Sequence, residues 1–64
     1  MRLTYDPAAD AAYLHLDQAH PPVTHTTPAG PLLLDWSGTT LIGIEVLDAA
    51  TVLPQTLLDS TKSS

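Results

Sequence analysis

Three histidines are the residues of this 64-residue chain that could most readily bind a metal or act in acid–base chemistry. His15, His20 and His25 lie in one stretch, and imidazole is a common ligand of zinc, nickel and copper. A site requires ligands that converge. If the segments carrying His15 and His25 pair as a hairpin, one register places the two rings on one face, and a register shifted by one residue places them on opposite faces.

Carboxylates are the second group with chemical potential. Asp6 and Asp10 are four residues apart around an expected helical turn, so both could reach one cation. A catalytic pair would need a cleft and shifted pKa values. The pattern favours a simpler interpretation, in which Asp6 caps the turn that Pro7 begins and Asp10 is solvated. Asp48 is predicted to cap a later helix, and Glu45 to point to solvent or to a partner.

Sequence motifs of catalysis and cofactor binding are missing. The chain has no cysteine, no G-x-S-x-G nucleophile elbow and no G-x-x-x-x-G-K-[ST] phosphate loop. We therefore predict no catalytic residue, no cofactor and no metal, and we do not expect an enzyme.

Alternation of polar and apolar residues with period two predicts short strands over 2–5 and 11–17. A β-branched segment predicts a short edge strand over 23–27, and apolar segments predict strands over 32–36 and 40–47. Ser37-Gly38 is typical of a hairpin turn, Pro28 to Pro31 predicts a break, and Gly43 indicates a bulge or a close backbone approach. The fold class is α+β, mostly β: a small antiparallel β-meander of four to five strands with a helical turn and a short C-terminal helix. We expect a single small β-rich domain over residues 1–59 and a frayed tail over 60–64.

Apolar side chains divide into an expected core and an expected contact surface. The core prediction contains Leu3, Tyr5, Leu14, Leu16, Leu32, Leu34, Trp36, Ile42, Ile44 and Val46. The candidate interface residues are Tyr13, Leu33, Leu53, Leu57 and Leu58, the last three as an apolar helical stripe. Tyr13 lies opposite the leucine face of its strand, so it is either exposed or covered by the C-terminal helix.

Charge and size restrict the partners. The formal charge is −5, and the only arginine and lysine are Arg2 and Lys62, which argues against direct nucleic-acid binding. No apolar run could span a membrane and no secretory leader is recognised, so we expect a cytoplasmic protein. A cysteine-free domain of this size has few means of stabilisation apart from association. We therefore predict a homo-oligomer, most simply a dimer.

Two motifs resemble a known family. Leu3-Thr4-Tyr5-Asp6-Pro7 is followed by Ala9-Asp10-Ala11-Ala12-Tyr13-Leu14, and later Leu33-Leu34-Asp35-Trp36 is followed by Leu41-Ile42-Gly43-Ile44-Glu45-Val46-Leu47-Asp48-Ala49. In order and spacing they are similar to the YuzE-like family of small bacterial proteins, domain of unknown function 2283, over most of Leu3 to Leu58. The resemblance implies no established activity. It implies small partner-dependent proteins, some of them suspected antitoxins.

The function predicted from these observations is a non-catalytic protein-interaction module, with antitoxin-like binding of a basic partner protein as its more specific form. The alternative is a small metal-binding protein or a hydrolase that uses His15, His20 and His25.

Overall fold

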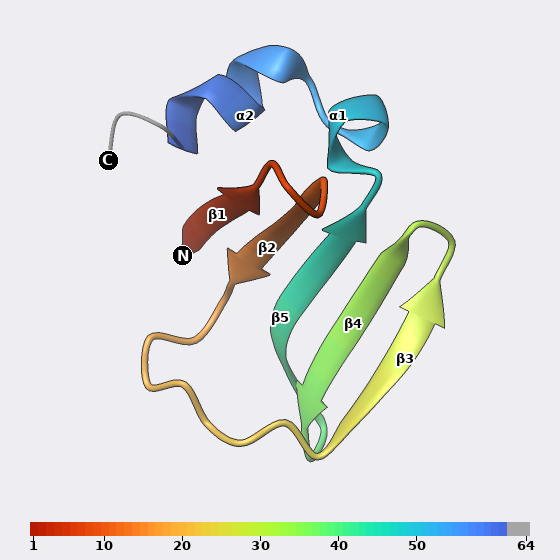
Figure 1. The fold of residues 1–64 in the computed structure, drawn as a ribbon. Helices are drawn as coiled ribbons and strands as arrows, with labels where there is room; N and C mark the ends of the chain where they lie inside the picture. The colour runs from red at the N-terminus through yellow and green to blue at the C-terminus, as the bar shows by residue number, and fades with distance from the viewer. Residues whose placement is uncertain (62–64) are drawn as a thin grey trace.

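The computed structural model describes residues 1–61 and shows one antiparallel sheet with two short helices. The order of the strands is β1-β2-β5-β4-β3 (Figure 1). The predicted fold class is therefore confirmed. In chain order, the elements are β1 (Arg2–Asp6), β2 (Ala11–His15), β3 (His25–Ala29), β4 (Leu32–Ser37), β5 (Thr40–Leu47), α1 (Ala49–Val52) and α2 (Gln55–Ser60).

Strand β5 lies in the middle of the sheet, between β2 and β4. Its apolar residues Ile44 and Val46 face Leu14 and Ala12 on β2, and they face leucines of β4 on the other side. The most apolar strand thus has two apolar neighbours, which removes most of its surface from water. As a consequence β2 and β3 are not neighbours. The hairpin considered for the segments of His15 and His25 does not form in either register.

Strand β3 forms the edge of the sheet beside β4 and contains Pro28. The sequence predicted a chain break at this proline. An edge strand tolerates proline because one row of its backbone groups has no partner strand. The turn follows instead at Gly30, where φ is +62°, and the predicted hairpin turn at Gly38 is confirmed with the same φ.

One face of the sheet, the helix-covered face, carries the core. Its buried residues are Ala12, Val46, Ala49 and Leu58, and against them pack the partly buried Leu3, Tyr5, Leu32, Ile44 and Leu53. Two of the four buried residues are alanines that the core prediction missed. Ala12 is 1% exposed and Ala49 is fully buried. Ala12 lies on β2 and Ala49 on α1. Their small side chains allow the helical segment to approach the sheet closely, so both residues are buried although neither is large. The predicted core residues Leu14, Leu16, Leu34 and Trp36 are only half-buried.

A β-bulge changes the direction of one predicted core residue. Asp35 pairs with Gly43 but the next residue, Trp36, pairs with Leu41, so Ile42 has no opposite residue on β4. Ile42 is buried, yet it lies with Tyr13 against a hollow on the face opposite the core. The prediction that Ile42 is buried is confirmed, but Ile42 lies outside the cluster that contains Val46 and Ile44, because the bulge interrupts the period of two.

Of the carboxylates Asp6, Asp10 and Asp48, only Asp6 has the predicted role. Asp6 accepts a hydrogen bond from the backbone N–H of Ala8 at 3.0 Å, as expected for a cap of this turn. Asp10 was expected to be solvated but is half-buried, and one of its oxygens accepts from the Tyr5 hydroxyl at 2.8 Å and from the N–H of Ala50 at 2.9 Å. Asp48 stands at the start of α1 but makes no capping bond with its side chain. Asp10 thus supplies the cap from across the fold.

Leu58→Ala tests the packing of α2. Leu58 is 1% exposed and its truncation leaves a cavity, so we expect the free energy of unfolding to fall by about 2–5 kcal/mol. The matched control is Leu57→Ala on the same helix, where the side chain is 41% exposed and the expected loss is below about 1 kcal/mol. Thermal denaturation followed by circular dichroism at low protein concentration measures both. Equal losses would contradict this packing.

Candidate functional site

The candidate site is the sheet face opposite the helices, here called the open face. The core residue Ala12 is the direct neighbour of Tyr13 on β2, and successive side chains of a strand point to opposite faces, so Tyr13 belongs to the open face. Tyr13 lies opposite Glu45 of β5, and Glu45 lies opposite Leu33 of β4. These three half-buried residues form a row across the middle strands. The alternative that the C-terminal helix covers Tyr13 was wrong, because that helix packs on the other face.

A second contact crosses β5 beside this row. The Tyr13 hydroxyl donates to Oδ2 of Asp35 at 2.6 Å, and Oδ1 of Asp35 accepts from the Thr26 hydroxyl at 2.7 Å. The Tyr13 ring reaches Asp35 by lying directly over Gly43, where a Cβ would overlap the ring and its hydroxyl. The predicted close approach at Gly43 is confirmed. We call Tyr13, Gly43, Asp35 and Thr26 the tyrosine clamp; it connects β2, β5, β4 and β3.

The protonation of the clamp follows from its surroundings. Burial, the hydrogen bond to Asp35 and the charges of Asp35 and Glu45 together raise the pKa of Tyr13 to about 12. The phenol therefore stays protonated and remains a donor to the carboxylate at neutral pH. The pKa of Tyr5 is raised as well, chiefly by its hydrogen bond to Asp10.

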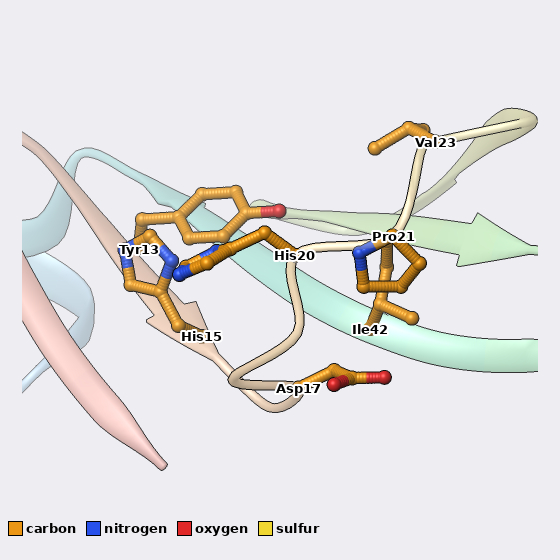
Figure 2. A pocket seen from close by; sticks show the side chains of 7 residues that line it. All are labelled: Tyr13, His15, Asp17, His20, Pro21, Val23 and Ile42. Carbon is orange, nitrogen blue, oxygen red and sulfur yellow. The ribbon is translucent and has the colours of Figure 1, made fainter.

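A hollow of about 270 Å³ lies next to the clamp (Figure 2). The rings of His15 and His20 are 6.0 Å apart in it, and the ring of Tyr13 is 4.6 Å from that of His15. Burial, and then the charges of Arg2 and His20, lower the pKa of His15, which favours the neutral imidazole. The lining residues are Tyr13, His15, Asp17, His20, Pro21, Val23 and Ile42.

The structure does not bring the three histidines together. His25 stacks on Trp36 with ring centroids 6.0 Å apart, and Trp36 alternates with Asp35 and so lies on the other face. In the hollow, Figure 2 shows the Asp17 carboxylate turned away from both imidazoles. Across residues 1–61, no cluster of three or more His, Asp or Glu side chains could hold a metal ion.

The predicted interface residues separate into three environments. Tyr13 and Leu33 are half-buried on the open face, and Leu57 is exposed on α2. Leu58 is buried in the core of the subunit and offers no accessible surface, whereas Leu53 is half-buried and packs against that core. The expected stripe of three leucines is divided, because Leu57 is exposed while Leu58 and Leu53 face the core, and Leu53 lies before α2 rather than within it.

The clamp residues Asp35 and Thr26 were missed by the sequence analysis. The available signal was a carboxylate inside the apolar segment Leu32–Trp36, since a charged group there requires a partner. The partner itself could not be named, because Tyr13 and Asp35 lie on strands that are not adjacent.

These features define a class of protein: a small, mostly β protein whose single sheet has helices on one face and aromatic, aliphatic and acidic side chains on the other. The chain belongs to the family described as "Protein of unknown function (DUF2283)", whose sequence pattern matches residues 2–49. The match contains all five strands and ends at Ala49, the first residue of α1, whereas the resemblance was expected to extend to Leu58. Neither the curated proteins nor the solved structures contain a match to the chain. No helix in the described part of the chain has the length and apolar character to cross a membrane.

A double-mutant cycle tests the clamp. Gly43→Ala places a methyl group where the Tyr13 ring lies, so we expect the free energy of unfolding to fall by about 1–3 kcal/mol. In a Tyr13→Ala background the same substitution should be neutral or stabilising, because a glycine inside a strand is unfavourable when nothing occupies its space. Urea denaturation of the four proteins measures the coupling. Equal effects of Gly43→Ala in both backgrounds would show that the ring does not lie over Gly43.

Alkaline pH should weaken the fold through Tyr13. Its pKa of about 12 lies above the ordinary value of 10.0, so its stabilising contribution is complete below pH 10 and is lost as the pH rises toward 12. Tyr13→Phe should flatten this loss while leaving the contribution of Tyr5. Chemical denaturation between pH 9 and about 12, with absorbance at the tyrosinate band, follows both. An ordinary tyrosine titration of Tyr13 would contradict the burial of its hydroxyl.

Proposed function

We propose that this protein is a non-catalytic protein-interaction module that binds a basic partner protein through its open face. The observation that supports it most directly is the row Tyr13, Glu45 and Leu33, which crosses the centre of the sheet on the face without helices. Aromatic residues are enriched at protein interfaces, and flanking apolar groups exclude water from a central polar contact.

Glu45 gives this row its preference for a basic partner. Both oxygens of the neighbouring Asp35 accept hydrogen bonds within the clamp, whereas Glu45 makes no hydrogen bond or ion pair with another residue of the described range 1–61. An arginine of the partner fits this arrangement, because its guanidinium can pair with the carboxylate and lie against the ring of Tyr13.

The overall charge supports the same assignment. A formal charge of −5 attracts a basic protein and accelerates encounter. The antitoxin-like form of the function, in which the module neutralises a basic toxin, extends what the family resemblance implies. A chain without cysteine fits the reducing cytoplasm, where we place this role.

Site-specific photo-crosslinking tests the surface. A photoreactive phenylalanine analogue replaces Leu33 on the open face or, as control, the 39%-exposed Val52 on α1, in cells that naturally carry the gene. Mass spectrometry then identifies the adducts. We expect one basic protein captured from position 33 and not from position 52. An acidic adduct, equal capture from both positions or no adduct from position 33 would overturn the proposal.

The charge of Glu45 is tested on the partner identified in this way. Glu45→Lys should weaken binding by at least tenfold, since it exchanges an attraction for a repulsion inside a contact. Asp48→Asn is the control: it removes one exposed carboxylate at a position with φ of +52°, a conformation that asparagine also adopts, and should change affinity less than threefold. Isothermal titration calorimetry measures both. Equal effects would show that only net charge matters.

A further inference from the structure

The outer edge of β1 is the part of the sheet best suited to a second polypeptide. β1 pairs with β2 on one side only, and the opposite edge of the sheet is β3. β3 contains Pro28, which has no N–H to donate to an added strand. β1 spans Arg2–Asp6 and has no proline, so its outward backbone groups can form a regular ladder.

The side chains of β1 are complementary to those of a second β1 running in the opposite direction. With Thr4 opposite itself, Arg2 faces Asp6, and Leu3 faces Tyr5. Opposite residues of an antiparallel pair project to the same face of a sheet. This register keeps the apolar Leu3 and Tyr5 on the helix-covered face, and it keeps the charged pair on the open face.

We propose that two copies of this chain associate by antiparallel pairing of their β1 strands around Thr4, forming a two-fold dimer with one continuous sheet. Two salt bridges between Arg2 of one subunit and Asp6 of the other fix the register. This contact goes beyond the proposed function, because it uses the edge of the sheet and leaves the open face accessible.

Charge selects this edge over other self-contacts. Arg2 is the only arginine or lysine within residues 1–61, and it forms no ion pair there with another described residue. Because each chain carries a formal charge of −5, two copies repel each other on average. At β1, each carboxylate of the pair meets the guanidinium of the other subunit instead.

A hollow of about 630 Å³ follows the same edge, between β1 and α2. Residues from both faces of β1 line it, among them Leu3 and Thr4, which places its opening at the edge of the strand rather than over one face. Figure 1 shows α2 beside β1, and no other strand or helix of residues 1–61 lies beyond β1. A strand added at this edge would occupy space that the single subunit leaves open.

A charge swap tests the register. By sedimentation velocity across a concentration series, Arg2→Asp and Asp6→Arg should each raise the dimer dissociation constant about tenfold or more, because each variant alone places like charges opposite each other. An equimolar mixture of the two variants should associate, since every pair is then of opposite charge. The double variant R2D/D6R should regain wild-type association. Circular dichroism checks folding, because Asp6 also holds its turn.

Thr4→Lys provides a test that leaves the Asp6 turn intact. It places two like charges on the two-fold axis and should abolish the dimer, whereas Thr39→Lys, at an exposed turn residue, should not. A wild-type monomer throughout the concentration series, or a dimer unaffected by Arg2→Asp and Thr4→Lys, would overturn the proposal. Crosslinking of a basic partner from position 33 would be unaffected by that result, so the two proposals fail separately.

Discussion

The structure depends on one constraint: its two short helices are too small to cover both faces of the sheet. The two helices contain four and six residues, while the five strands contain five, five, five, six and eight. Ten helical residues cannot cover both faces of a sheet of 29 residues. They cover part of one face, and the buried set of that face is correspondingly small. The other face must be stabilised by its own side chains, because a single sheet has no second layer to pack against.

The tyrosine clamp performs part of that stabilisation. One side chain from β2 crosses the central strand and reaches a carboxylate that is also held by β3, so the contact links elements that have no direct backbone pairing. The clamp requires that residue 43 has no side chain, because the Tyr13 ring occupies that space. The neighbouring bulge directs Ile42 to the same hollow that Tyr13 lines. The glycine, the bulge and the tyrosine are thus parts of one arrangement. A ring held in this way is also preorganised as a contact surface, since little side-chain entropy remains to be lost on binding.

The sequence predicted those features that depend on neighbouring residues. Four of the strand segments, the hairpin turn at Gly38 and the close approach at Gly43 follow from local pattern or from glycine. β3 was predicted over 23–27 but lies over His25–Ala29, because an edge strand can include Pro28. The order of the strands cannot be predicted in this way. The central position of β5 between two apolar neighbours depends on how all five strands pack together, and not on residues near it in the sequence. The role of Asp10 could not be predicted for the same reason. Its partner Ala50 is 40 residues away in the sequence, so the residues near Asp10 indicate only a solvated turn residue. Ala12 and Ala49 were missed because hydrophobic size was taken as the mark of burial, whereas here the closest packing is at the smallest residues.

The separation of the histidines has consequences for function. His15 and His20 share a hollow that is open to solvent, and His25 lies across the sheet on Trp36. An imidazole acting as a general base needs a positioned partner, and a metal needs further ligands on the same side. The carboxylate best placed in the sheet, Asp35, is already bonded to Tyr13 and Thr26, which leaves Glu45 as the acidic group available at the centre of the open face. If two subunits join at β1, the two-fold axis is perpendicular to the sheet, so both open faces lie on the same side. A basic partner could then meet two copies of the Glu45 surface at once, and the second contact would form at a high effective concentration.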